Sequence, residues 1–251
     1  MQTIYKVSLI LTFFLALFYA FQSFYPDLMY SFSNIFPPLI AGAAFASSIL
    51  ALARYWGSLK EYFSLSWLCF AIGLGLWFLG EASWAVHTLY LGIELPYPSF
   101  ADVFWLGGYI PMLIALLFYV KAFLKVLPGR VIYAITLAIL VLAVLMLTVL
   151  AAPVFGAEED LAVIFADFAY PILDTVLLYL AILSSAVFYK GRIGKSWLFI
   201  TAGFISYTIA DLLFSYTTTY GMYYCGHPLE LLFHLGYLSL ILAFHIHVKE
   251  L

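Results

Sequence analysis

The chain has 251 residues, of which 66% are hydrophobic and 9% are charged, and its formal net charge is -3. This composition excludes an ordinary soluble domain, because too few polar side chains remain to cover a surface exposed to water. The sequence has no basic tract, which excludes nucleic acid as a partner. We therefore expect a protein that is surrounded by membrane lipids.

Eight apolar segments follow one another along the chain, and each is long enough to cross a hydrocarbon core of about 30 Å as a helix. They cover residues 4–23, 36–54, 66–90, 100–120, 130–152, 161–189, 196–219 and 228–248. The first segment resembles a signal peptide, but no clean small-x-small cleavage site follows it, so we expect it to remain as a helix. The sequence predicts an all-α membrane protein with about eight transmembrane helices.

The basic residues indicate the orientation of these helices. All ten lie at the two termini or in the connections that follow even-numbered segments. They are Lys6, Arg54, Lys60, Lys121, Lys125, Arg130, Lys190, Arg192, Lys195 and Lys249. The opposite connections carry Asp27, Glu94 and the acidic run 158–160. Because basic connections stay on the cytoplasmic side, both termini are predicted to be cytoplasmic, in the cell membrane.

The third and fourth segments resemble the seventh and eighth. Matched residues include Ser66-Trp67-Leu68 with Ser196-Trp197-Leu198, Gly73 with Gly203, Glu81 with Asp211, Asp102 with Glu230, and Gly108-Tyr109 with Gly236-Tyr237. A weaker match pairs Asn34 with Asp167 and Pro38 with Pro171. We expect two direct four-helix repeats, 1–125 and 126–251, related by a pseudo-twofold axis along the membrane normal. The groove between them is the natural place for a site.

Ionisable side chains inside the predicted spans are the first candidates for that site, because they are costly in lipid. They are Glu81, Asp102, Asp167, Asp174, Asp211, Glu230 and His234. Because they lie toward the outer ends of their helices, we expect a ligand-binding pocket that faces the external side. In particular, Glu81 and Asp211 should be buried and should face one shared cavity.

Each acid also has a simpler interpretation. Asp102 follows Ser99 at capping-box spacing, and Glu230 lies in the first turn of its helix, so both are suited to satisfying helix N-termini. Glu81 and Asp211 are also suited to holding neighbouring helices together by hydrogen bonds. The composition leaves these alternatives open.

Two further pairs of residues have more than one interpretation. Asp167 and Asp174 share a helix face with Pro171 between them, which fits either a pocket wall or local compensation around the proline. Glu230 and His234 are one turn apart and offer two ligands to a divalent metal, although a lone pair is a weak signal. No catalytic motif is present, so we do not expect an enzyme, and an intramembrane metal hydrolase is the remaining enzymatic alternative. The sequence identifies no cofactor.

Aromatic residues accompany the symmetric acids. Trp77, Trp84 and Tyr207 share their helix faces, which fits a cation or chromophore pocket as well as ordinary packing and interface belts. Near the end of the last segment, His245 and His247 are expected at the cytoplasmic surface.

Three segments carry a resemblance to a known family. They are PYPSFADVFWLGGY (Pro96 to Tyr109), DFAYPILDTVLL (Asp167 to Leu178) and ADLLFSYTTTYGMYYCGHPLELLFHLGY (Ala210 to Tyr237). Across residues 60–248 the chain resembles an unnamed polytopic module that precedes diguanylate cyclase or histidine kinase domains in prokaryotic signalling proteins. The resemblance implies a sensory input domain whose recurring polar positions match the six candidate acids. This chain ends at Leu251 without an output domain, so we expect either a separate cytoplasmic signalling partner or another role.

The leading functional hypothesis is a stand-alone sensor or receptor-like protein. Its outward pocket would bind a small molecule, an ion or a lipid headgroup, and binding would favour one of two arrangements of the repeats. The alternative is a proton- or cation-coupled transporter, which parallel repeats and membrane carboxylates also fit.

Overall fold

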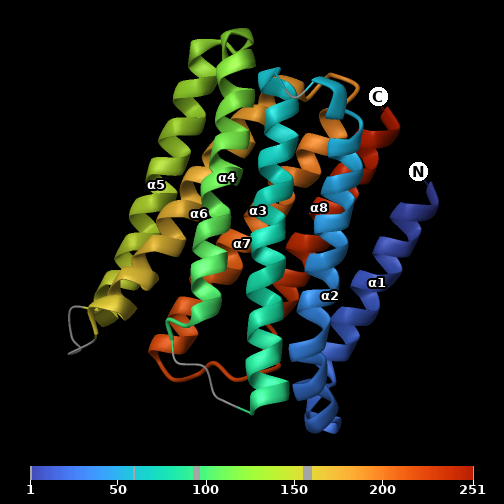
Figure 1. The fold of residues 1–251 in the computed structure, drawn as a ribbon. Coiled ribbons are helices and arrows are strands. Elements are labelled where there is room, and N and C mark those ends of the chain that lie inside the picture. Colours follow the sequence, from blue (N-terminus) through green and yellow to red (C-terminus); the bar gives the residue numbers. More distant parts are fainter. Residues whose placement is uncertain (1, 59, 93–96, 155–159, 251) are drawn as a thin grey trace.

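The computed structural model describes residues 2–58, 60–92, 97–154 and 160–250, which form eight long helices (Figure 1). They are α1 (Gln2–Ala20), α2 (Pro26–Ala53), α3 (Tyr62–Ala85), α4 (Phe100–Phe123), α5 (Gly129–Val154), α6 (Leu161–Phe188), α7 (Gly194–Thr219) and α8 (Glu230–Glu250). All eight are long and apolar enough to cross a membrane. These lengths and compositions support the prediction of an all-helical, multi-pass membrane protein.

Short helical turns extend or connect the long helices. Three of them are 3₁₀ turns, namely η1 (Gln22–Phe24), η2 (Trp56–Ser58) and η4 (Leu124–Val126). The fourth, η3 (Val86–Leu91), continues α3 as a π-helical turn. It ends at Gly92, whose φ of 62° is left-handed and therefore suits glycine.

Helix α2 begins at Pro26, well before the predicted start at residue 36. Proline suits the first turn of a helix because its φ is already helical and its missing N–H is not needed there. The helix then continues through Pro37 and Pro38, which membrane helices tolerate when neighbouring groups satisfy the freed carbonyls. As a result, Ser33 and Asn34 lie within the helix, and both are buried.

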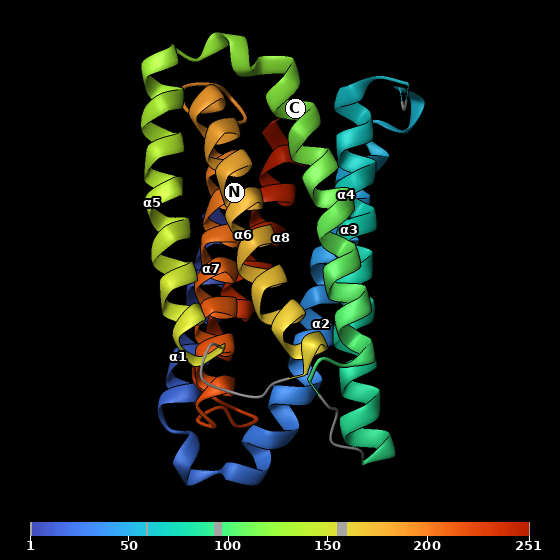
Figure 2. The same cartoon turned by 90° about the vertical axis from the view of Figure 1, so that its left-hand side faces the viewer.

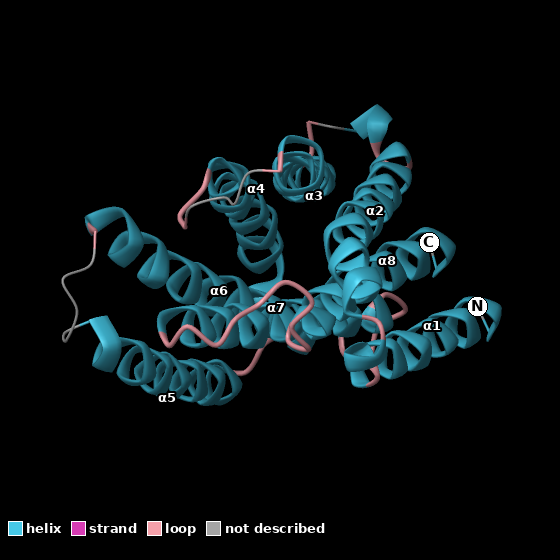
Figure 3. Ribbon diagram, turned by 90° about the horizontal axis from the view of Figure 1, so that it is seen from below, coloured by secondary structure: helices cyan, strands magenta, loops and turns pink. Residues whose placement is uncertain are grey.

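Six helices enclose the centre of the molecule. Contacts join α2 to α3, α3 to α4, α4 to α6, α6 to α7, α7 to α8 and α8 to α2, so these six helices form a closed ring. Seen along the bundle, α2, α3 and α4 face α6, α7 and α8 (Figure 3). Helix α1 packs outside the ring on α8, whereas α5 packs outside on α6 and α7. Figure 2 shows α5 along the outer edge of the bundle.

Glycines bring neighbouring helices of the ring unusually close. A Cβ atom added to Gly73 of α3 would lie 2.9 Å from the carbonyl oxygen of Gly108 on α4, and a Cβ on Gly108 would lie 2.9 Å from that of Gly73. A Cβ on Gly203 of α7 would lie 3.2 Å from the carbonyl oxygen of Gly236 on α8. Small residues allow such approach, which is a common way for membrane helices to pack.

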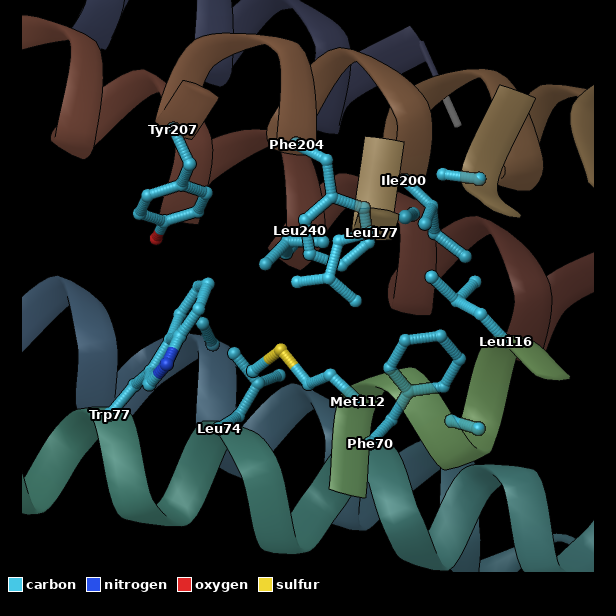
Figure 4. Packing of buried hydrophobic residues seen from close by; sticks show 14 of the residues in the cluster. Phe70, Leu74, Trp77, Met112, Leu116, Leu177, Ile200, Phe204, Tyr207 and Leu240 are labelled. Atoms are coloured by element: carbon cyan, nitrogen blue, oxygen red, sulfur yellow. The ribbon is translucent and has the colours of Figure 1, made fainter. Parts of the chain in front are cut away.

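Apolar side chains fill the ring over its middle and toward the end that carries the termini. Figure 4 shows residues of α3 and α4 facing residues of α6, α7 and α8 across the centre. The labelled side chains are Phe70, Leu74, Trp77, Met112, Leu116, Leu177, Ile200, Phe204, Tyr207 and Leu240. All are almost fully buried, so this part of the ring is a packed core rather than a pore.

His247 does not lie at the surface as its sequence position suggested. It is fully buried, and its Nε2 lies 2.6 Å from the hydroxyl of Tyr55. The Trp67 ring lies over it with the ring centroids 3.9 Å apart. The expectation was wrong because α8 is enclosed by α2 and α7 almost to its end, so this face of the last turn points inward.

Candidate functional site

A cavity of about 280 Å³ lies inside the ring. Its lining residues come from the helix ends that lie away from the chain termini, which are marked N and C in Figure 1. Its walls come from the first halves of α2, α4, α6 and α8 and the last halves of α3 and α7. Tyr97 and Tyr223, in the connections before α4 and α8, also border it. Five of the predicted site residues line the cavity, namely Glu81, Asp102, Asp211, Glu230 and His234.

Glu81 and Asp211 each accept a hydrogen bond from a tyrosine on the opposite side of the ring. Tyr237 of α8 donates to Oε1 of Glu81 on α3 over 3.0 Å. Tyr109 of α4 reaches Oδ2 of Asp211 on α7 over 3.2 Å. Both acidic side chains are partly exposed rather than fully buried as expected, because both border the cavity. These bonds join α3 to α8 and α4 to α7 at the cavity wall.

Asp102 caps a helix and also lines the cavity. Its Oδ2 accepts hydrogen bonds from the backbone N–H of Ser99, over 2.5 Å, and from the Ser99 hydroxyl, over 2.8 Å. This completes the predicted capping box at the start of α4. Its Oδ1 accepts a third bond of 2.6 Å from the hydroxyl of Tyr170 on α6. The two interpretations of Asp102 are therefore compatible.

Glu230 is bonded through both of its oxygens. Oε1 accepts from the backbone N–H of Gly226, over 2.7 Å, and from the hydroxyl of Tyr223, over 3.0 Å. Oε2 accepts from the hydroxyl of Tyr19, over 3.0 Å. The same Tyr19 hydroxyl lies 2.8 Å from Nε2 of His234. A residue of the outer helix α1 thus reaches into the site between the two members of the predicted metal pair.

The described residues offer no complete metal site. No group of three or more His, Cys, Asp and Glu side chains in this part of the chain is arranged to hold a metal ion. The Glu230 and His234 pair stands alone, and the Tyr19 hydroxyl is hydrogen-bonded to both members. Nδ1 of His234 is buried and has no hydrogen-bond partner among the described residues. It remains available to a ligand.

Asp167 and Asp174 lie behind the cavity wall rather than on it. Tyr97, which lines the cavity, donates to Oδ1 of Asp167 over 2.8 Å, and Tyr109 donates to Oδ1 of Asp174 over 2.8 Å. The single hydroxyl proton of Tyr109 faces carboxyl oxygens of both Asp174 and Asp211. Both contacts can be hydrogen bonds at once only if one of the carboxyl groups carries a proton. Tyr109 therefore joins two acids that are suited to sharing a proton.

The tyrosines in the connections remain protonated donors. Burial raises the pKa of Tyr97 above its usual value, and the neighbouring Asp167 carboxyl raises it further. Burial likewise raises the pKa of Tyr223 well above its usual value, and Glu230 adds to the effect. Neither hydroxyl ionises at neutral pH, so each donates a hydrogen bond to an acid of the site.

The sequence prediction missed most of these donors. Tyr109 occupies the repeat position of Tyr237, so the repeat alone could have identified both. Tyr97 and Tyr170 lie in two of the segments that carry the family resemblance, but no sequence match pairs them with an acid. Tyr19 carries no signal, because nothing local separates it from the other tyrosines among the 20 of the chain.

Comparison with known proteins gave no family model, no curated protein and no solved structure that matches the chain. Its function must therefore be argued from the geometry of the site.

Proposed function

We propose that the protein is a membrane sensor or receptor-like module that binds a small ligand in this cavity. The observation that carries the proposal is the cavity itself, which is lined by four carboxyl groups and contacts helices from both ends of the chain. A polar cavity inside an apolar bundle lowers the stability of the fold, because each buried acid needs hydrogen-bond partners. We therefore expect such a cavity to serve a function. The proposed ligand is a small molecule, an ion or a lipid headgroup.

The family resemblance supports a sensory role. All three resembling segments supply lining residues, including Asp102 from the first, Tyr170 from the second and Asp211 from the third. In the resembling module, such a region forms a signal-receiving domain. A cytoplasmic signalling partner would then read the state of this chain.

The distribution of basic residues supports an orientation. The cavity lies opposite the ends and connections that carry Lys and Arg. With those connections and both termini in the cytoplasm, the cavity would lie toward the external side of the cell membrane.

Reciprocal contacts support two direct repeats related by a pseudo-twofold axis. The bond from Tyr237 to Glu81 and the bond from Tyr109 to Asp211 connect equivalent positions of the proposed halves. Trp77 and Tyr207 are also equivalent, and their ring centroids are 4.6 Å apart. Such a pair belongs near a twofold axis. The outer helices α1 and α5 pack differently on the ring, so the proposed symmetry concerns the ring helices.

The same contacts suggest how a signal would travel. A ligand that competes for Glu81 or Asp211 changes hydrogen bonds that hold one half against the other. If it binds two arrangements of the halves with different affinities, it shifts their populations by that difference in free energy. The connections at the far end of the ring would then move relative to one another.

A ligand screen on the purified full-length chain tests this proposal. Metabolites, ions and lipids that fit the cavity should raise its unfolding temperature, and Glu81→Gln and Asp211→Asn should reduce the effect of a true ligand. In cells, the same variants should lose the phenotype of the parent protein. A broad screen without any stabilising ligand, together with an unchanged phenotype in both variants, would disprove the sensor.

Proton- or cation-coupled transport is the second candidate, and the contact of Tyr109 with Asp174 and Asp211 favours it. Acids that share a proton are typical of proton relays in membranes. A transporter also needs a route to the other side, and the packed core between the cavity and the terminal end of the ring weighs against one. Flux in proteoliposomes that is lost in Asp174→Asn would favour transport over sensing.

A further inference from the structure

We propose that the cavity takes an organic cation, with the ammonium group of an amine or quaternary ammonium compound placed against Glu81 and beside the tryptophan rings. This inference rests on the proposed function and names the class of ligand for the same site.

The charge of the lining selects a cation. Glu81, Asp102, Asp211 and Glu230 all border the cavity, whereas its described lining contains no Lys or Arg. Their donors are mainly tyrosine hydroxyls, which leave the negative charge in place, as a Lys or Arg partner would not. An anionic ligand would meet like charges in a site of low dielectric constant, and this costs far more than it does in water.

Glu81 keeps one carboxyl oxygen free for a ligand. Both oxygens of Asp102 and both oxygens of Glu230 accept hydrogen bonds, and Asp211 contacts both Tyr109 and the carboxyl group of Asp174. Glu81 accepts one bond, to Oε1, and no described residue donates to its Oε2. Its side chain is partly exposed at the cavity. This oxygen is therefore the natural partner for an ammonium group.

A buried polar atom without a hydrogen-bond partner indicates a missing ligand group independently of the acids. Nδ1 of His234, which lines the cavity, is buried and has no partner among the described residues. Buried polar atoms are rarely left unsatisfied, and a neutral imidazole nitrogen can accept a hydrogen bond from the N–H of a primary ammonium group. The hydroxyl of Tyr207 is a second polar group at the cavity, and Figure 4 shows it pointing from α7 across the ring toward Trp77.

Aromatic rings form the wall beside Glu81. A Cβ atom added to Gly80 would lie 2.5 Å from the ring of Trp105. The Trp105 ring therefore packs on α3 at the residue before Glu81. The ring centroids of Trp84 and Trp105 are 6.1 Å apart. The indole N–H of Trp84 is already bonded to Asn34 over 3.2 Å. The faces of these rings remain available to a ligand, and such faces attract a cation most strongly where water is excluded.

An inorganic divalent ion fits this lining less well. Calcium takes about six to eight oxygen ligands, and magnesium needs a near-octahedral set. The described residues provide no cluster of metal ligands, and most carboxyl oxygens here are already bonded to tyrosines. A cation with an apolar surface satisfies the acids and covers the aromatic walls at once.

The test compares ligands of one shape and different charge on the purified full-length chain in detergent. In 3,3-dimethylbutan-1-ol a carbon atom replaces the charged nitrogen of choline, so the two compounds have the same shape and only choline is charged. Butylamine and butyrate provide a primary ammonium and an anion of similar size. Binding is measured by calorimetry and by the shift in unfolding temperature.

We expect choline or butylamine to bind at least about tenfold more tightly than the neutral and anionic compounds, a difference of about 1.4 kcal/mol. Glu81→Gln should weaken that binding by a similar factor, whereas Asp27→Asn, a control at an exposed acid outside the cavity, should not. Trp84→Leu should also weaken binding, and it keeps the inference testable if Glu81→Gln does not fold.

Two results would overturn the inference. Equal or tighter binding of the neutral or anionic compound would reject the cation and leave the proposed receptor intact, since the cavity would still hold a ligand. Failure of all four probes to bind rejects the organic cation, and the broad screen above then decides whether the receptor fails with it.

Discussion

Tyrosine is the residue that supplies hydrogen bonds to the acids of the cavity in this apolar bundle. Its ring packs among hydrophobic neighbours, while its hydroxyl donates one hydrogen bond to a carboxyl group. Tyr237, Tyr109, Tyr170 and Tyr19 all act in this way at the cavity wall or behind it. Because these donors are neutral, they satisfy carboxyl oxygens without bringing a positive charge into the cavity.

Tyr237→Phe should destabilise the protein by about 1–2 kcal/mol, because Glu81 loses its one described donor. The free energy of unfolding in mixed detergent micelles measures the loss. In a double-mutant cycle with Glu81→Leu, which removes the acceptor, the two changes should be less than additive. Tyr133→Phe is the control, since Tyr133 is 77% exposed on α5. Strict additivity of Tyr237→Phe and Glu81→Leu would show that the bond contributes nothing.

Cys225 should react slowly with alkylating reagents at neutral pH. Burial raises the pKa of its thiol, and the nearby Glu230 carboxyl raises it further, while contacts with Ser33 and Asn34 oppose the shift. The reactive thiolate therefore appears only at a higher pH than in an unfolded chain, where the midpoint is about 8.5. The rate of iodoacetamide modification against pH, in a Cys69→Ala background, measures this midpoint. The same chain unfolded in detergent provides the reference, and equal midpoints in the two states would contradict the prediction.

At the scale of elements, the closest helix pairs depend on particular glycines. Gly108→Ala should destabilise the protein by about 1–3 kcal/mol, because the added Cβ would lie 2.5 Å from the ring of Trp77 and 2.9 Å from the backbone of α3. Gly107→Ala is the matched control on the same turn, where the nearest atom would be 4.0 Å away. It should be neutral or slightly stabilising, since alanine favours helix over glycine. Thermal unfolding of both variants tests the prediction, and equal effects would refute the close approach of α3 and α4.

Helix α1 is attached to the site mainly by one side chain. Much of its surface is exposed, but Tyr19 is buried and bonds to Glu230 and His234. Tyr19→Phe should therefore speed hydrogen exchange in α1 while α3 and α4 stay protected. Tyr5→Phe is the control, because Tyr5 stacks on Phe199 and its ring is kept. Unchanged exchange in α1 after Tyr19→Phe would mean that other contacts hold this helix.

Sequence patterns predicted the elements better than the site. Seven of the predicted segments lie close to the observed helices, because a long apolar run has few alternatives to a membrane helix. The start of α2 was missed, since the predicted segment begins at residue 36 whereas the helix begins at Pro26 and continues through Pro37 and Pro38. The acids were found because carboxyl groups are rare in apolar runs. Their tyrosine partners were not, since a partner is chosen by the packing of distant helices, as with Tyr19 and Glu230.

At the scale of the whole molecule, polar and apolar interiors occupy opposite ends of one ring. Residues such as Glu81 and Asp211 border a cavity at the end away from the termini, and residues such as Phe70 and Leu116 fill the other part. A ligand that enters from the cavity end meets a closed floor at Trp77 and Tyr207. This division suits recognition of a ligand on one side of a membrane and a change of helix positions on the other.

The side that the cavity faces can be tested with two single cysteines in a Cys69→Ala, Cys225→Ser background. Ser23→Cys lies at the cavity end, in η1, and Tyr189→Cys lies at the other end, directly after α6, and both positions are exposed. Neither change alters a basic residue, so the signal that orients the chain is kept. We expect a membrane-impermeant maleimide to label Ser23→Cys in intact cells, and to label Tyr189→Cys only after the membrane is opened. The reverse pattern would place the cavity on the cytoplasmic side, and the proposed ligand would then have to come from inside the cell.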